Sequence, residues 1–294
     1  MPEISFVYPN LAKTHLKSKT MRGGLSERWT LAQETGCEYF EIAGTLIKNK
    51  TEERLTSLNI GDFLSQKEIS LLYNQDNEIP QGLKYILHTE PSLSKPNRYG
   101  RKITSPINWH DRKWSYRYLE MIFSIADYLN HPPTVVEIHP GYRDNSFKDV
   151  ASFTEMILGS FRDKYGKAPL VLLENRTEQF ISSGNEIKEY WEYIVDNHPR
   201  IIKNTGIVLD IQQLYTKTRG NFLEELVAIP EGCLKAFHIH TRHRWPKLSD
   251  EIPWRFVFGR IKTLSGKILI NPEIHQKGRV SQVIKFCNEL LRYD

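Results

Sequence analysis

The stretch PLVLLEN (169–175) joins an almost unbroken apolar run to a glutamate at its end, and this arrangement decides the fold. Such runs are typical of strands that are buried on both faces of a parallel sheet. Seven other stretches are predicted as strands, and most of them have polar residues near their ends. They are ISFVY (4–8), EYFEIAG (38–44), KYILHTEP (84–91), TVVEIHPG (134–141), GIVLDI (206–211), LKAFHIH (234–240) and KILINPEI (267–274). The sequence therefore predicts about eight strands.

Helical segments alternate with these strands. Apolar residues recur at helical spacing in 25–36, 112–130, 152–166, 186–197 and 279–291. Alternation of strands and helices over 294 residues predicts an α/β fold, a single (β/α)8 TIM barrel domain spanning residues 1–294. A doubly wound sheet is the alternative.

Composition restricts the class of protein. The chain is 39% hydrophobic and 26% charged, as expected of a globular protein with a core. It has no apolar run of about 18 residues, so no membrane association is expected. The start of the chain, MPEISFVYPN, predicts a strand rather than a signal peptide, and the three cysteines are far apart. We therefore expect a cytoplasmic protein without disulfides, and nothing indicates a protein partner.

Polar residues gather at the ends of the predicted strands. A single one of them is more often structural, but six consecutive strands share the feature. In a barrel these ends meet at one mouth, where several carboxylates and imidazoles would be costly to bury without a counter-charge. A set of His, Asp and Glu without cysteine indicates a divalent metal ion, with Zn, Mn or Fe preferred. The residues are His88, Glu137, His139, Glu174, Asp210, His238, His240, Glu273 and His275.

Four of these stretches resemble the xylose isomerase-like TIM barrels, which include sugar isomerases, epimerases and endonuclease IV. The matching stretches are VLLENRT (171–177), GIVLDIQQ (206–213), AFHIH (236–240) and INPEIH (270–275). Within this superfamily, YILHTEPS (85–92) and VEIHPGY (136–142) resemble endonuclease IV and AP endonuclease family 2.

The resemblance implies two metal sites that share Glu174. One metal would be held by His88, His139 and Glu174. The other would be held by Glu174, Asp210, Glu273 and a strand-seven histidine, for which both His238 and His240 remain open.

This chain departs from endonuclease IV at the residues that hold the third metal in that family. It has Asp210-Ile-Gln-Gln213 instead of Asp-x-x-His, and it has no Asp-x-His between 241 and 262. The resemblance then implies two metals, or a third one held differently. His243 is the main candidate for that role, and Gln213 and His275 are further candidates.

Positive charge is concentrated in three segments that are predicted to follow strands one, three and seven. Segments 9–28, 91–113 and 241–262 hold 17 basic and four acidic residues, a balance of +13, whereas the remainder has a balance of −8. The same segments hold Tyr99, Trp109, Trp245 and Trp254. A basic, aromatic rim predicts a nucleic acid or another phosphorylated substrate, although long solvated loops would explain the charge as well.

The leading hypothesis is a metal-dependent phosphodiesterase acting on nucleic acid, similar to an apurinic-site or damage-specific endonuclease. Its catalytic residues would be Glu174 bridging the metals, Glu137 as a base or partner of a ligand, Glu273, and Arg242 stabilising charge on the phosphate. The alternative is a sugar or sugar-phosphate isomerase or epimerase, with Glu174 and Glu273 as paired bases. An iron-dependent oxidase and a non-catalytic binding module are further hypotheses.

Overall fold

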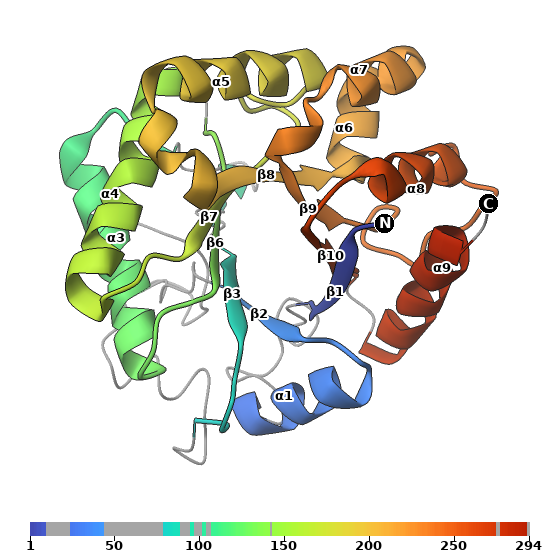
Figure 1. Cartoon of the computed structure of the whole chain (residues 1–294), viewed down its shortest axis with the longest axis horizontal. Helices are drawn as coiled ribbons and strands as arrows, with labels where there is room; N and C mark the ends of the chain where they lie inside the picture. Colours follow the sequence, from blue (N-terminus) through green and yellow to red (C-terminus); the bar gives the residue numbers. More distant parts are fainter. Residues whose placement is uncertain are drawn as a thin grey trace.

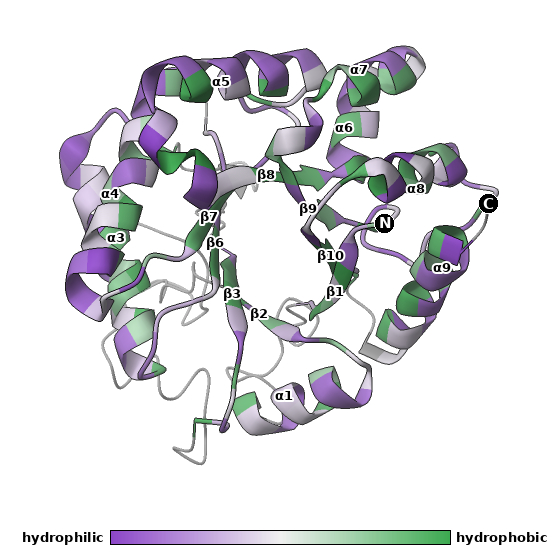
Figure 2. Cartoon of the chain, in the orientation of Figure 1, coloured by the Kyte–Doolittle hydropathy of each residue, from purple (hydrophilic) through white to green (hydrophobic). Residues whose placement is uncertain are grey.

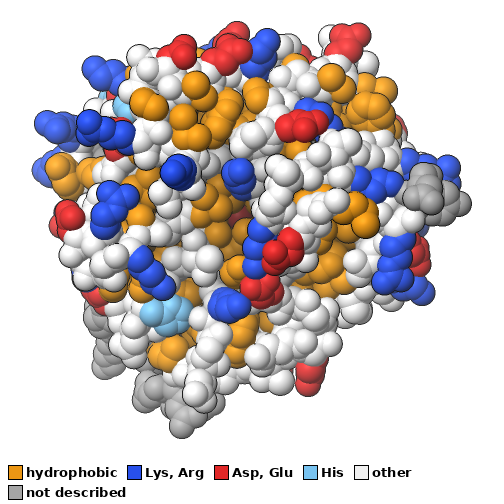
Figure 3. Space-filling view, in the orientation of Figure 1, with side chains coloured by type: hydrophobic (Ala, Val, Ile, Leu, Met, Phe, Trp, Pro, Cys, Tyr) orange, Lys and Arg blue, Asp and Glu red, His pale blue; other side chains and the backbone are white. Residues whose placement is uncertain are grey.

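Eight parallel strands form a closed barrel with helices around it (Figure 1). The structure is a computed structural model that describes residues 1–9, 24–43, 79–88, 95–96, 102–103, 107–141, 143–274 and 277–292. The strand order is β1-β10-β9-β8-β7-β6-β3-β2, so the first strand pairs with both the second and the last. The predicted (β/α)8 barrel is confirmed. Seen in the same orientation, acidic and basic side chains lie beside one another near the middle of the visible face (Figure 3).

All eight predicted strands are present. The barrel strands are β1 (Glu3–Tyr8), β2 (Tyr39–Ala43), β3 (Tyr85–His88), β6 (Val135–Ile138), β7 (Leu170–Glu174), β8 (Thr205–Asp210), β9 (Leu234–His238) and β10 (Lys267–Asn271). Two short strands, β4 (Lys95–Pro96) and β5 (Lys102–Ile103), pair outside the barrel.

The five predicted helices also form. The described residues contain the α-helices α1 (Gly24–Glu34), α3 (Arg112–Tyr128), α4 (Phe147–Tyr165), α5 (Gly184–Asn197), α6 (Ile211–Thr218), α7 (Phe222–Ala228), α8 (Trp254–Thr263) and α9 (Val280–Arg292). None of the helices in these described ranges is long and apolar enough to span a bilayer.

Helices α6, α7 and α8 were not predicted. The first two have only eight and seven residues, too few turns to show a clear apolar period. The expectation that all of 241–262 is a loop is wrong, because α8 begins at Trp254. Arg260 on α8 donates to Glu231 and to the carbonyl of Ile229, just before β9 begins. Arg260 therefore lies away from the barrel mouth.

The interior of the barrel contains one ring of apolar side chains, with one member from each strand. This ring is separate from the larger core between the sheet and the helices, where hydrophobic residues line the strands and the inner sides of the helices (Figure 2). Its members are Val7, Tyr39, Ile86, Val135, Leu172, Val208, Ala236 and Leu269. These side chains pack the interior of the barrel at this level.

A charged cluster joins the strands where the barrel closes. Glu38, directly before β2, accepts hydrogen bonds from Ser5 Oγ at 2.6 Å, Lys84 Nζ at 3.0 Å and Lys267 Nζ at 2.8 Å. Burial alone would raise the pKa of Glu38, but the hydrogen bonds from Lys267, Ser5 and Lys84 lower it to about 2.

Replacement of this carboxylate tests its contribution to barrel closure. We expect Glu38→Gln to lower the free energy of unfolding at pH 7 by about 1 kcal/mol, since the cluster is partly exposed to solvent. Because the pKa is lower in the folded state, this contribution is full well above about pH 4.3 and disappears as the pH falls towards 2. Urea unfolding at several pH values measures it, with Glu34→Gln on the exposed face of α1 as control. An unchanged difference between pH 7 and pH 3 would contradict the assignment.

Candidate metal centre

The polar residues of the site form a second ring inside the barrel, directly above the apolar one. Successive side chains of a strand alternate between its two faces, so the residue two positions after an interior residue also points inward. In seven strands that residue is polar and at most 5% exposed: Glu41, His88, Glu137, Glu174, Asp210, His238 and Asn271. The strand pairing therefore brings together side chains that are up to 230 residues apart in sequence.

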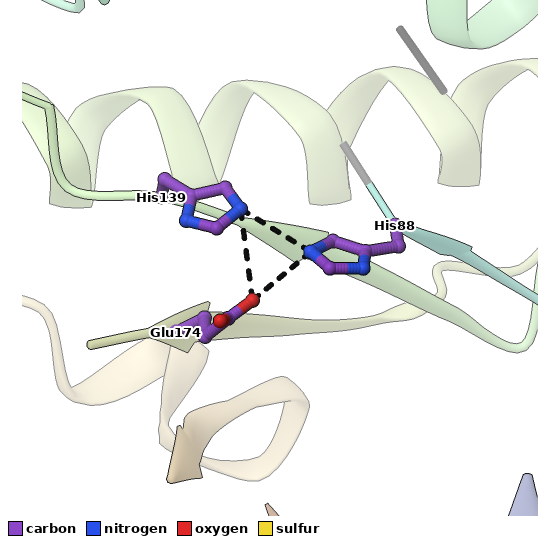
Figure 4. A group of neighbouring side chains, drawn as sticks. All are labelled: His88, His139 and Glu174. Atoms are coloured by element: carbon purple, nitrogen blue, oxygen red, sulfur yellow. Dashed lines mark hydrogen bonds and ion pairs between the residues drawn. The ribbon is translucent and has the colours of Figure 1, made fainter. Parts of the chain in front are cut away.

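The first cluster combines two members of this ring, His88 and Glu174, with His139, which directly follows β6 (Figure 4). Glu174 Oε2 lies 2.9 Å from His88 Nε2 and 3.6 Å from His139 Nε2. The two Nε2 atoms are 3.2 Å apart. Three potential ligand atoms therefore face one point, and the cluster is buried.

The second cluster consists of Glu174, Asp210, His238 and Glu273. His238 Nδ1 lies 3.6 Å from Glu174 Oε1 and 3.4 Å from Glu273 Oε2. Glu273 follows the end of β10 by two residues and is 7% exposed. Glu174 belongs to both clusters and directs a different oxygen to each, which is the geometry of a bridging carboxylate.

These clusters fit divalent ions. Both carboxylate oxygens of Glu174 and both ring nitrogens of His238 are buried without a hydrogen bond of good geometry, as is Glu273 Oε2. Ligand atoms bound at about 2.1 Å in a tetrahedral site lie about 3.4 Å from one another, which matches the separations seen here. Buried His, Asp and Glu side chains in this arrangement are consistent with a site for more than one metal ion.

Two further carboxylates orient the histidines. Glu41 Oε1 accepts from His88 Nδ1 at 2.7 Å and thereby leaves His88 Nε2 for a metal. Glu137 Oε2 lies 3.4 Å from His238 Nε2 and leaves His238 Nδ1 for the other cluster. Such partners fix the tautomer of a metal-bound imidazole. This geometry supports a role for Glu137 as the partner of a ligand.

Sequence reasoning missed Glu41 and its neighbour Asn271, whose Nδ2 donates to Glu41 Oε2 at 2.8 Å. A signal for Glu41 was present, because it is the only charged residue in the strand segment YFEIA. Arg176 was also missed, and its Nη1 lies 3.8 Å from Glu174 Oε1.

The ionisable groups of the site strongly affect one another. Burial would lower the pKa of His88, but the adjacent carboxylates of Glu174 and Glu41 raise that pKa well above the usual value. Burial would also lower the pKa of His238, but the carboxylates of Glu174, Glu137 and Glu273 raise it well above the usual value. Burial would raise the pKa of Glu174, but attraction to His139 and His238 lowers it well below its usual range. Without metal, protons on the imidazoles therefore balance the buried carboxylates.

His240 lies outside the ring, two residues beyond the end of β9. Its Nδ1 accepts the backbone N–H of His243 at 3.1 Å, and its Nε2 lies 3.3 Å from Asp210 Oδ2 and 3.2 Å from Glu273 Oε2. Burial lowers the pKa of His240, whereas Asp210 and Glu273 raise it to about 10. The N–H of His243 requires a lone pair on Nδ1 and so opposes the second proton that the raised pKa would place there, which leaves the single proton of His240 on Nε2. In this tautomer His240 donates to two carboxylates of the second cluster.

His243 stacks on His240, with ring centres 4.6 Å apart and planes 11° apart. Its Nδ1 is 3.8 Å from Glu273 Oε1, so geometry alone also groups His240, His243 and Glu273 as potential ligands. The hydrogen bond between His243 and His240 Nδ1 disfavours that third site, because it leaves His240 Nε2 with a proton instead of a lone pair.

The other predicted site residues, Gln213, Arg242 and His275, are not part of either cluster as the structure describes it. Gln213 Oε1 accepts the N–H of Thr177, and the N–H of Gln213 donates to Asp210 Oδ1. Arg242 is exposed, and its N–H donates to Gln212 Oε1. His275 lies outside the described residues, as do residues 10–23 and most of 91–106 of the predicted basic rim.

Comparison with known proteins adds the fold family. No protein-family model and no curated protein matches the sequence. Solved structures are similar over almost the whole chain. An AP endonuclease of family 2 from Brucella melitensis has 14% identity and a TM-score of 0.55, with 98% of this chain and 99% of that chain covered.

Two other structures are similar to the same degree. A D-allulose 3-epimerase from Methylomonas sp. has 12% identity and a TM-score of 0.58, covering 99% of each chain. A xylose isomerase domain protein from Alicyclobacillus acidocaldarius has 15% identity and a TM-score of 0.54, covering 98% of each chain. The chain has the fold of the xylose isomerase-like TIM barrels, and the predicted resemblance is confirmed at that level.

Competition between protons and metal gives a first test of the site. Because the pKa values of His88 and His238 are raised in the metal-free protein, a bound metal must displace protons from them. We expect metal affinity to fall as the pH is lowered, by up to tenfold per pH unit for each proton displaced. Calorimetric titration with Zn²⁺ at pH 6, 7 and 8, in buffers of different ionisation enthalpy, counts these protons. Affinity independent of pH would contradict metal binding at these histidines.

The tautomer of His240 gives a second test, using matched substitutions two residues apart. His238→Gln removes a ligand atom and should lose one equivalent of metal. His240→Gln keeps an N–H donor towards Asp210 and Glu273, and should keep the metal with an affinity about tenfold lower. Elemental analysis after dialysis measures both. Loss of a metal equivalent in His240→Gln would show that His240 is a ligand.

Proposed function

We propose that the protein is a divalent-metal-dependent phosphodiesterase acting on nucleic acid, similar to an apurinic-site or damage-specific endonuclease. The observation that carries the proposal is the position of Glu174 between two clusters. A pair of metals about 4 Å apart clamps the attacking and leaving oxygens of a phosphodiester. A bridging carboxylate with histidines on both sides supplies the ligands for such a pair.

The residues around the clusters support this chemistry. Bound metals would polarise the phosphate and lower the pKa of a water molecule. Glu41 and Glu137 hold His88 and His238 in the required tautomers. His240 holds the carboxylates of Asp210 and Glu273 in place through Nε2. Arg176, beside Glu174 and partly exposed, is placed to stabilise negative charge on a phosphate oxygen.

Cleavage of a defined duplex tests the proposal. We expect the protein with Mn²⁺ or Zn²⁺ to nick a duplex that contains a single abasic site, and to leave the undamaged duplex intact. Glu174→Gln should reduce the rate at least a hundredfold, because it removes the charge shared by both clusters. Glu189→Gln, an exposed glutamate on α5, is the matched control and should keep full activity. Absence of nicking with each metal, on abasic and ultraviolet-damaged duplexes alike, would refute the proposal.

A sugar or sugar-phosphate isomerase or epimerase is the second candidate. The observation in its favour is that Glu174 and Glu273 lie in one cluster with Asp210 and His238, where two carboxylates could exchange a proton with a metal-bound ketose. Incorporation of deuterium from solvent into ketoses, followed by NMR, would support this activity. One metal per chain would agree with it, and two would agree with the phosphodiesterase.

A further inference from the structure

A cavity of about 410 Å³ lies beside the metal centre. None of the residues that line it belongs to either cluster. One wall is helix α6, from which Gln212 and Tyr215 line the cavity, together with Arg219 directly after the helix. Gln212 and Tyr215 are three residues apart and therefore lie on the same face of the helix. Because Asp210 caps the N-terminus of α6, this wall begins two residues after a potential metal ligand.

The other wall is the segment that follows β9. It enters the cavity at Thr241, one residue after His240, and continues to Ile252. Since His240 contacts Asp210 at 3.3 Å, both walls start from the same edge of the metal centre. The walls of the cavity therefore begin next to Asp210 and His240, at one edge of the metal centre.

A strained turn sets the direction of this second wall. Thr241 and Arg244 exchange two backbone hydrogen bonds, of 3.0 and 2.9 Å, around Arg242 and His243. Both central residues have positive φ, 50° and 55°, in a turn that normally selects Asn and Gly. The turn places His243 on His240 and brings Arg242 and Arg244 to the cavity. Strain held beside a potential active site indicates that these side chains serve binding rather than folding.

The charges of the cavity divide into paired and available groups. Arg219 is paired with Glu251 at 3.8 Å, and Asp250 accepts from Thr241 Oγ1 and the N–H of Lys247. Within the part of the chain that the structure describes, no acidic side chain forms an ion pair with Arg242, Arg244 or Lys247. Three cations thus remain available for an anionic ligand.

An aromatic side chain completes the cavity. Trp245 is 36% exposed, and Arg279 lies over its ring at 5.7 Å. An exposed indole next to arginines is the combination on which proteins stack the bases of a nucleic-acid strand. A small sugar phosphate would occupy one cation and leave the indole and the other cations without a role.

We propose that this cavity binds a backbone phosphate and the adjoining base of a nucleic-acid strand whose next phosphodiester lies at the metal centre. The inference rests on the proposed function and names the part of the substrate that Arg242, Arg244, Lys247 and Trp245 recognise. Phosphate contacts of this kind add affinity that depends on salt and not on sequence.

The test compares two pairs of substitutions with the same chemistry and spacing. Arg244→Gln with Lys247→Gln removes two cations of the cavity. Arg200→Gln with Lys203→Gln removes two exposed cations directly before β8, at the opposite end of the barrel. The ligand is a fluorescein-labelled 12-nucleotide phosphorothioate DNA strand, and anisotropy is measured with the protein as purified between 50 and 200 mM salt.

We expect the cavity pair to bind the strand about tenfold more weakly and to lower the slope of log affinity against log salt by about one to two. The control pair should match the wild type. Trp245→Ala alone should also weaken binding of the strand, but should leave the slope of log affinity against log salt unchanged, because stacking does not displace counterions. Equal affinities in the wild type and the cavity pair would overturn the inference.

Two further results separate this inference from the proposed function. If the cavity pair weakens strand binding but the wild type cleaves no substrate, the cavity is supported and the nuclease activity is refuted. If the wild type cleaves DNA and the cavity pair cleaves and binds as well as the wild type, the activity stands and the inference fails. A ribose or glucose phosphate that binds the wild type more tightly than the strand, and loses affinity in the cavity pair, would also refute the assignment to nucleic acid.

Discussion

Burial of charge in one ring of the barrel is the constraint on which the rest of the site depends. Closure of the sheet places the carboxylates of Glu41, Glu137, Glu174 and Asp210 in the same layer as two imidazoles, all but excluded from water. Carboxylates in such a place require a counter-charge of similar size. Protons on His88 and His238 supply it in the metal-free protein, and divalent ions would supply it better. Glu174 has the central position because its two oxygens face different clusters.

The two interior rings and the segments beyond the strands have different roles in the structure. The apolar ring fills the barrel and fixes the strands against one another. The polar ring lies two residues further along the same strands. Because those strands are fixed against one another, its ligand atoms are held at the separations that a metal requires. Beyond the strands, the turn at Arg242 and His243 stores backbone strain and connects the metal centre to a basic cavity. The candidate ligands therefore lie on or directly after the barrel strands, and the segments beyond the strands line the cavity.

Much of the fold and part of the site could be predicted from sequence, and the exceptions have identifiable causes. The strand that contains Glu174 was predicted to within a residue because its apolar run is long and its end is polar. Helices α6 and α7 were missed because fewer than three turns give little periodicity. Glu41 was missed because it lies inside β2 and not at its end, and its place in the ring follows from its position two residues after the interior Tyr39. His238 and His240 could not be ranked because residues two apart share a face only while the strand continues, and β9 ends at His238.

The sequence by itself determined the alternation of strands and helices, the order of the candidate ligands and the absence of cysteine among them, since these are properties of local pattern and composition. Only the tertiary structure decided which ligand atoms meet, because that depends on strand register across the closed barrel. It also decided which histidine nitrogen carries a proton, since Glu41, Glu137 and the N–H of His243 reach their partners only after folding. For the same reason, the basic cavity between α6 and the segment after β9 is a product of packing that no single stretch of sequence encodes.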